Sequence, residues 1–383
     1  MSALTGLTIK GFRRLLDVEI PLRPLQVLIG VNGCGKTSVL DALSLLAAAS
    51  RGDLARALST MGGIGDVLTR DRAHVVELGV TVQGDGESAA SLAYRIALEP
   101  KGQGFWIPRE SLVARPSGGA APFEHIESLA GDARYFDGRT RAAIPITASL
   151  QTTCLSSYRS DLLPQAQALP ASLDSMELYG TLDVQPRSPI RLPQRMQPAD
   201  LPGRGGEDLV SALYNLREAD EDRFEVLQDT LRAGFPDFEK LAFPPAATGL
   251  LSMTWKDKSF SKPLYMHQLS EGTLRFLWLA TLLQSRSIGA VTLLEEPEIG
   301  FHPELQRLLI DLMREVSKRT TLIVTTHSDR FVRFIEPEEL LIMDTDEGIA
   351  KVTRADQHAG IADWLSDYGL DELWRAGRLG GRS

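Results

Sequence analysis

The residues with the clearest chemistry in this chain lie in a glycine-rich loop near the N-terminus. Residues 30–37 read Gly-Val-Asn-Gly-Cys-Gly-Lys-Thr and directly follow the apolar run Leu25–Ile29. This is the pattern G-x-x-x-x-G-K-[ST] between a predicted strand and a predicted helix. Its glycines let backbone N–H groups turn toward a polyphosphate. The predicted phosphate-binding residues are Gly30, Asn32, Gly33, Cys34, Gly35, Lys36, Thr37 and Ser38.

Two side chains at the end of this loop have specific tasks. Lys36 offers a positive charge to the β- and γ-phosphates, and the Thr37 hydroxyl is suited to coordinate Mg²⁺. The chain then reads KTSVLDALSLLAAA, which is rich in the strong helix formers Leu and Ala. The phosphates would therefore sit at a helix N-terminus. ATP is favoured over GTP, because the chain has no N-K-x-D pattern of the kind that reads guanine.

A second candidate anion site is the LSEGT segment, Leu269–Thr273. It opens the apolar stretch GTLRFLWLATLLQ, whose spacing predicts a largely buried helix. Ser270 and Gly272 would lie at the N-terminus of that helix, where free N–H groups and the helix dipole favour an anion. An ordinary serine cap followed by glycine explains the same pattern equally well when the segment is taken by itself.

Two carboxylates follow the next predicted strand. The apolar run Ala290–Leu294 ends in Glu295-Glu296-Pro297-Glu298. Acids at a buried strand end are costly unless a cation or a proton-transfer role holds them. In P-loop enzymes the first acid at this place binds Mg²⁺ and the next polarises the attacking water. We therefore expect Glu295 to serve the metal and Glu296 to be catalytic.

A histidine completes the set. Residues 321–326 form another apolar strand with a polar end, and His327 follows it directly. A lone histidine is usually structural or merely exposed. At a strand end that follows the acid pair, His327 has a specific task available, namely a hydrogen bond to the γ-phosphate or to the attacking water.

The order of these motifs resembles that of the ATP-binding-cassette (ABC) ATPases, in the branch that holds RecF, Rad50, the SMC proteins and the OLD-type ATPases. Ile9-Lys10-Gly11-Phe12-Arg13 looks like the start of that branch, and residues 295–306, EEPEIGFHPELQ, look like the Walker B motif and D-loop of OLD-like ATPases. The tail LWRAGRLGG is also similar. The resemblance implies an α/β fold: a P-loop ABC-type ATPase head with an antiparallel β-subdomain and a helical insertion.

The resemblance also implies a shared site with ATP and Mg²⁺ as cofactors. The LSEGT segment is expected to lie too far from its own phosphate loop, so two chains would pair head to tail. Ser270 and Gly272 of one chain would then cap the γ-phosphate held by the other. Arg13 is a candidate for a further phosphate contact, although a surface salt bridge fits it as well. Gln151 is the candidate Q-loop residue, and a solvated glutamine remains the alternative.

Some features depart from the family. Glu295 stands where transporters use Asp. The stretch after His327 is too short for the toprim nuclease domain of full OLD proteins, and we expect none. The region between Lys36 and Ser270 lacks sustained heptads, so we expect no long coiled-coil arm. Without either, the chain would need a nuclease, another effector or DNA to receive its signal.

Composition points to a soluble enzyme of the cytoplasm. Hydrophobic residues make up 43%, no apolar run is long enough for a membrane helix, and the N-terminus lacks a signal-peptide core. The two cysteines, Cys34 and Cys154, argue against a disulfide framework. The net charge of −9 opposes indiscriminate nucleic-acid binding. The one basic stretch, with Arg187, Arg191, Arg195 and Arg204, is either a solvated irregular loop or a nucleic-acid or partner surface.

Five regions are expected along the chain. They are an N-terminal ATPase lobe with the Walker A motif and β-subdomain (1–100), an irregular loop-rich insertion (101–206), a helical insertion (207–245), a C-terminal ATPase lobe with the signature, Walker B, D-loop and His-loop (246–345), and a tail (346–383).

Three functions remain open at this stage. The first is an ATP-driven dimer switch that acts on DNA in repair or anti-phage defence, with a nuclease or other effector as partner. The second is a regulatory ATP-sensing module that holds a toxic effector with little hydrolysis. The third is a transporter ATPase subunit, which the helical insertion and the EEPEIGFHP sequence oppose.

Overall fold

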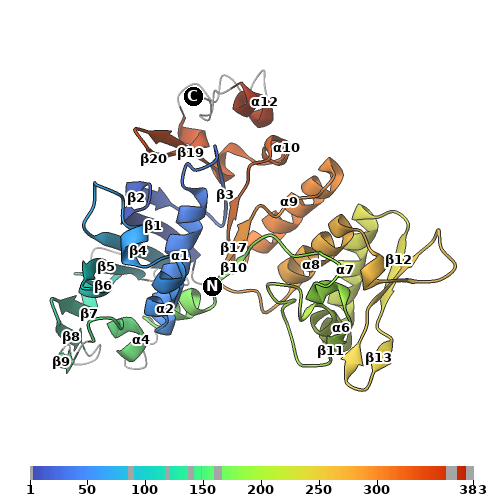
Figure 1. Cartoon of the computed structure of the whole chain (residues 1–383), viewed down its shortest axis with the longest axis horizontal. Helices are drawn as coiled ribbons and strands as arrows, with labels where there is room; N and C mark the ends of the chain where they lie inside the picture. The colour runs from blue at the N-terminus through green and yellow to red at the C-terminus, as the bar shows by residue number, and fades with distance from the viewer. Residues whose placement is uncertain are drawn as a thin grey trace.

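The computed structural model describes residues 3–84, 90–116, 121–136, 142–147, 149–158, 166–358 and 369–376. Two sheets and a helical lobe make up most of it (Figure 1). The order of elements confirms the predicted α/β class with an antiparallel subdomain and a helical insertion.

A six-stranded sheet forms the centre, in the order β10-β17-β18-β3-β19-β20. The first five strands are parallel, and β20 is antiparallel to β19. Every residue of β3 is buried, as expected for a strand of continuous apolar sequence covered on both faces. The bounds are β3 (Leu25–Gly30), β10 (Glu177–Tyr179), β17 (Val291–Glu295), β18 (Thr321–Thr325), β19 (Leu340–Asp346) and β20 (Ile349–Arg354).

Helices cover both faces of this sheet. On one side α1 (Lys36–Arg51) packs between the central sheet and the antiparallel sheet, and on the other α9 (Pro303–Ser317) packs on β3 and β18. Left-handed glycines at Gly35 and Gly52 bound α1, and Pro303 occupies the first turn of α9, where its missing N–H costs nothing. Shorter helices are α2 (Leu54–Thr60), α3 (Ile64–Val67), α4 (Cys154–Tyr158), α5 (Ala168–Asp174) and α10 (Asp329–Val332).

The antiparallel sheet has eight strands, in the order β2-β1-β4-β5-β6-β7-β8-β9. The expected N-terminal block is confirmed, but the interpretation of 101–206 as irregular was wrong, because four strands of that region extend the sheet. The turn-like sequence Gly-Asp-Gly-Glu-Ser at 84–88 lies largely outside the described residues. The strand bounds are β1 (Ala3–Phe12), β2 (Leu15–Pro21), β4 (Val76–Gln83), β5 (Ser91–Lys101), β6 (Gly104–Arg115), β7 (Phe123–Leu129), β8 (Asp132–Phe136) and β9 (Ala143–Thr147).

The helical lobe contains α6 (Leu209–Ala219), α7 (Glu221–Gly234) and α8 (Glu271–Gln284), which pack together. The helical insertion expected at 207–245 contains α6 and α7, and a hairpin of β15 and β16 precedes LSEGT. Two small sheets complete the lobe: β11 (Gln194–Arg195), β14 (Leu250–Leu251) and β13 (Pro245–Ala247) form one, and β12 (Phe238–Ala242), β15 (Thr254–Asp257) and β16 (Leu264–Tyr265) form the other.

The described residues form two apolar cores. One lies between α1 and the antiparallel sheet, and the other lies under the helical lobe and the α9 side of the central sheet. The tail expected at 346–383 begins with β20, which belongs to the central sheet, and continues to α12 (Leu370–Arg375); residues 377–381 of the LWRAGRLGG tail lie outside the described part. Short 3-10 helices are η2 (Pro189–Arg191), η3 (Met266–Gln268), η4 (Pro337–Glu339) and η5 (Ala355–Gln357).

Among the described helices, none combines the length and the apolar character needed to cross a membrane.

Candidate functional site

The candidate site lies where three neighbouring parallel strands end. In the register, Glu295 at the end of β17 faces Thr325 at the end of β18, which faces Leu28 of β3. Because carboxyl ends of parallel strands meet at one edge of a sheet, the loops that follow them converge there. The edge therefore brings together the phosphate loop, the acids and His327, although each comes from a different part of the sequence.

The glycines of the phosphate loop are required by its path. Gly33 and Gly35 have φ values of 77° and 110°, in the left-handed region that residues with side chains rarely adopt. Gly30 is required for a different reason, since a Cβ there would lie 2.3 Å from Met343 O of β19 and 2.5 Å from Cys34 Sγ. Asn32 is exposed, and Ser38 is buried in the first turn of α1. Strand β19 and Cys34 therefore leave no room for a side chain at position 30.

Lys36 is held inside the loop. Its Nζ donates hydrogen bonds to Gly30 O at 2.8 Å and Val31 O at 3.1 Å, and it lies 3.8 Å from Cys34 Sγ. The side chain is only 4% exposed. Burial lowers the Lys36 pKa, and the neighbouring Cys34 and Glu296 oppose that shift. The ammonium is thus positioned by the loop itself.

His327 connects Lys36 to Glu296. Lys36 Nζ lies 3.4 Å from His327 Nδ1, and His327 Nε2 lies 3.4 Å from Glu296 Oε1. Burial, and then the charge of Lys36, lower the His327 pKa, which favours the neutral ring at neutral pH. A neutral ring that accepts from the ammonium at Nδ1 carries its proton on Nε2, directed at the carboxylate. The three predicted catalytic residues therefore form one connected row.

Glu296 reaches this row through an uncommon backbone conformation. Its φ is 48°, in the left-handed region, while its N–H still donates to Thr325 O at 2.9 Å. A non-glycine residue in such a conformation costs about 1–3 kcal/mol and persists where the surroundings hold it. Here the turn after β17 separates the two acids, with Glu296 facing His327 and Glu295 facing Thr37.

Thr37 and Glu295 form the predicted metal pair. The Thr37 hydroxyl donates to Glu295 Oε1 at 3.0 Å. A hydroxyl and a carboxylate at this separation are the hard oxygen donors that Mg²⁺ takes, with phosphate and water oxygens filling the remaining positions. The residues present fit the ion, and the glutamate in place of the aspartate of transporters still reaches the threonine.

Glu298, the third acid of the Glu-Glu-Pro-Glu sequence, is buried. Thr326 Oγ1 donates to its Oε1, while Oε2 has no hydrogen-bond partner among the described residues. Burial raises the pKa of Glu298 to about 7. A carboxyl group in this place is largely protonated at slightly acidic pH and partly charged at neutral pH.

The LSEGT segment does not join this cluster. Ser270 is exposed and caps α8, and its Oγ accepts from Thr273 N at 3.1 Å. Gly272 lies against the turn after the acids, where a Cβ would come within 3.2 Å of Gly300 O. Figure 1 shows α8 in the helical lobe and α1 on the far side of the central sheet. The helix start is confirmed, and its anion-binding role stays a prediction.

Two further candidates lie away from the cluster. Arg13, in the turn between β1 and β2, is paired with Asp41 on α1, so its phosphate contact stays a prediction that requires this pair to open. Gln151 donates to Phe105 O of β6 at 3.2 Å, within the antiparallel lobe. That position does not support a Q-loop role.

The segment beside the acids is instead the exit of β10. This strand is parallel to β17, and a Cβ built on Gly180 would lie 3.7 Å from Glu295 Oε2. Sequence reasoning missed it because a three-residue strand, Glu177–Tyr179, gives no periodic signal.

Comparisons with known proteins agree with this geometry. Residues 165–333 match the family model described as "AAA domain, putative AbiEii toxin, Type IV TA system", and residues 3–79 match a model described as "AAA ATPase domain". The chain is 24% identical to an OLD nuclease of Thermus scotoductus over 409 residues, an alignment that covers 99% of this chain and 68% of the relative.

Solved structures with a similar fold include SMC head domains. An SMC head bound to the C-terminal winged-helix domain of ScpA superposes with a TM-score of 0.59 at 16% identity, covering 92% of this chain and 97% of the other. The SMC head from Pyrococcus furiosus, bound to the C-terminal domain of ScpA, gives 0.57 at 14% identity, covering 96% and 100%.

By these comparisons the chain resembles the ABC-like ATPases of the branch that includes the OLD and SMC proteins, and its P-loop sequence lies at the edge of the central sheet.

Proposed function

We propose that the chain binds ATP with Mg²⁺ and hydrolyses it, and that hydrolysis requires two chains. The observation that carries the proposal is the connected row of Lys36, His327 and Glu296 beside the pair of Thr37 and Glu295. Phosphoryl transfer needs positioned charges and an oriented water rather than covalent chemistry, and this edge supplies those groups.

Each residue has a separate task in this proposal. Lys36 and the loop N–H groups bind the β- and γ-phosphates, and the N-terminus of α1 adds its dipole. Thr37 and Glu295 would hold Mg²⁺, which neutralises charge on the phosphates when it is bound. Glu296 orients the attacking water through an accepted hydrogen bond. His327 fixes the Glu296 carboxylate from Nε2 and contacts Lys36 from Nδ1, so it responds to how the lysine engages the phosphate.

The proposal requires a second chain because the α8 half of the γ-phosphate site faces solvent. The exposed N-terminus of the 14-residue helix α8 offers free N–H groups and the Ser270 hydroxyl to solvent. In a head-to-tail pair these donors would face the γ-phosphate held by the other chain and exclude water from it. Contacts in such an interface are stronger because the local dielectric is lower.

Two variants test the shared site. Glu296→Gln should retain ATP while turnover falls by at least about 100-fold, and this variant should dimerise when ATP and Mg²⁺ are added. Ser270→Arg should block dimerisation and turnover but keep single-chain ATP binding. Light scattering and a phosphate-release assay measure these quantities.

The matched control is Ser287→Arg, which adds the same charge just beyond the opposite end of α8 and should behave like the unmodified chain. A Ser270→Arg protein that hydrolyses ATP at the normal rate as a monomer would refute the shared site. A Glu296→Gln protein with normal turnover would move the water-orienting role to Glu295 or Glu298.

For the pathway, we propose that the switch acts with DNA or with a nuclease-like effector. The OLD nuclease relative supports this, although this chain spans about two thirds of that protein. A module that holds a toxic effector is the second candidate, favoured by the toxin–antitoxin description of the matched family model. DNA-stimulated turnover supports the first candidate. Turnover indifferent to DNA, together with a stable complex between this chain and the protein of an adjacent gene, supports the second.

A further inference from the structure

The arginine-rich stretch singled out in the sequence is an ordered connection between the acids and the helical lobe. We name residues 180–206, from the exit of β10 to the loop before α6, the strap. Leu182, Val184 and Ile190 of the strap are buried in the core of the helical lobe. Within the arginine-rich stretch, Ile190 and Gln194 are buried while many other residues are exposed, so this largely irregular segment is anchored at a few points.

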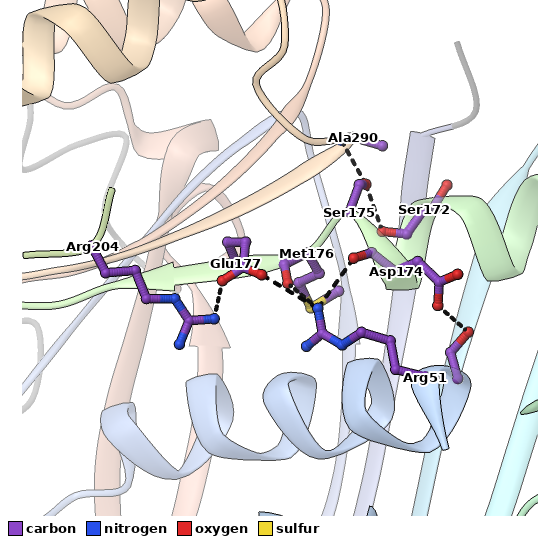
Figure 2. A network of polar contacts seen from close by, with 9 residues as sticks. Arg51, Ser172, Asp174, Ser175, Met176, Glu177, Arg204 and Ala290 are labelled. Carbon is purple, nitrogen blue, oxygen red and sulfur yellow. Dashed lines mark hydrogen bonds and ion pairs between the residues drawn. The ribbon is translucent and has the colours of Figure 1, made fainter. Parts of the chain in front are cut away.

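The four arginines divide into two kinds. Arg187 and Arg195 are exposed, whereas half-buried Arg191 and exposed Arg204 bond to other segments of the chain. Arg204 bonds to Glu177 of β10, which is also paired with Arg51 at the end of α1 at 3.4 Å (Figure 2). This contact fixes the last turn of the strap to the strand at which the strap begins.

Arg191 makes a different kind of contact. Its Nε donates to Val184 O at 2.6 Å, within the strap. Its Nη1 donates to Leu269 O at 2.9 Å and lies 3.3 Å from His267 O. The guanidinium therefore joins the strap to Leu269, the residue directly before Ser270. Its acceptors are backbone carbonyl groups, so the contact does not depend on which side chains stand at the acceptor positions.

A continuous path results. Gly180, at the first position of the strap, lies beside Glu295 of the metal pair. Val184 lies four residues further along the chain, Arg191 bonds to its carbonyl group, and the same guanidinium bonds to that of Leu269. The edge that would bind the phosphates of one nucleotide is thus connected to the α8 terminus that would face another.

We propose that Arg191 is a positioning residue that couples the nucleotide edge of its own chain to the LSEGT segment. The inference rests on the proposed ATP-dependent dimer. When nucleotide engages Glu295 and the exit of β10 shifts, the strap moves, and Arg191 carries that movement to Leu269. The planar fork of arginine suits this task, since its donors have fixed relative directions that a lysine ammonium lacks.

The test uses the Glu296→Gln chain as parent, with Arg191→Ala, Arg191→Lys and the matched control Arg187→Ala added to it. Thermal unfolding establishes that each variant folds, and Arg191→Lys serves if Arg191→Ala does not. Arg191→Ala should bind ATP as a single chain with a dissociation constant within about twofold of the parent. Its ATP-dependent dimerisation should weaken by at least about tenfold, the scale of losing charge-assisted hydrogen bonds, and Arg191→Lys should lie between.

Hydrogen exchange supplies a readout that a purely structural role would not change. ATP should alter amide exchange at both 180–186 and 266–273 in the parent and in Arg187→Ala. In Arg191→Ala only 180–186 should respond.

Two outcomes would overturn the inference. If Arg191→Ala dimerises and exchanges like Arg187→Ala while the parent dimerises, Arg191 does not couple the two segments. If the parent and Arg187→Ala remain monomeric with ATP, the shared-site function itself is wrong, and the role of Arg191 is wrong with it.

Discussion

The two halves of the proposed ATP site are built in different ways within one chain. At the edge of the central sheet, Lys36, His327 and Glu296 contact one another before any partner is added. At the start of α8, Ser270 and Thr273 bond only locally and Ser270 is exposed. The first half is formed by contacts within one chain, and the second half would be completed only by a second chain. Variants of the first half should therefore affect single chains, and variants of the second should affect pairs.

Lys36→Ala should give the largest effect. It removes a buried charge that the loop positions for the phosphates, so single-chain ATP affinity should fall by at least about 100-fold, or roughly 3 kcal/mol. Isothermal titration with the Ser270→Arg chain as background isolates this half, because that chain should not pair. Unchanged affinity would mean that the loop amides alone hold the nucleotide.

Glu298→Gln tests how the buried acid of the sheet-edge half of the site contributes to stability. With a folded pKa of about 7 against an ordinary value of 4.5, the folded chain binds the extra proton. Stability from this group is therefore fully present below pH 4.5 and is lost as pH rises to about 7. The free energy of unfolding should fall by about 2–3 kcal/mol between pH 5 and pH 8 in the unmodified chain.

That slope should shrink in Glu298→Gln and remain in Glu304→Gln, which changes an exposed acid of α9. Urea unfolding without nucleotide at several pH values measures it. An equal slope in all three proteins would assign it to other groups.

Gly30→Ala and Gly33→Ala compare two reasons for glycine in the phosphate loop. The first is close contact with the backbone of β19, and the second is a positive φ. The added Cβ meets Met343 O and Cys34 Sγ, so the free energy of unfolding should drop by about 1–3 kcal/mol. In Gly33→Ala the added Cβ meets nothing within 4 Å, and only the φ of 77° is unfavourable for alanine. The free energy of unfolding should therefore fall by about 1 kcal/mol. Thermal unfolding of the two variants compares them directly, and the reverse order would contradict the close approach of β19.

Ser270→Ala should give the smallest effect on the single chain and a larger one on the pair. Loss of the cap on α8 costs about 1 kcal/mol of stability. Under the shared-site proposal, ATP-dependent dimerisation of the Glu296→Gln background should weaken beyond that amount, since the hydroxyl is also a donor to the nucleotide. Equal losses in stability and dimer affinity would mean that Ser270 acts only as the N-cap of α8.

The sequence predicted that the phosphate loop, the acid pair and His327 each follow a strand, because these signals are local. The phosphate loop, the acid pair and His327 each follow directly on a buried apolar strand, and parallel strands bring their ends together. The α8 start was predicted for the same reason, since a serine cap precedes an apolar helical run.

What could not be predicted depends on distant partners. Strand β6 contains Pro108 and the buried Glu110, which do not read as a strand; Glu110 is accommodated because Tyr94 and the N–H groups of Cys154 and Leu155 bond to it. Gln151 was chosen for its residue type, but its amide bonds within the antiparallel lobe. The three residues of β10 can be recognised as a strand only from their pairing with β17.

The backbone of Glu296 sets stability against activity at one position. A glycine there would adopt the same turn without the steric cost that a φ of 48° imposes on glutamate. The chain would then gain thermal resistance and lose the carboxylate proposed to orient water. Under the proposed function, a Glu296→Gly chain would therefore be more stable than the unmodified chain and would retain ATP without hydrolysing it.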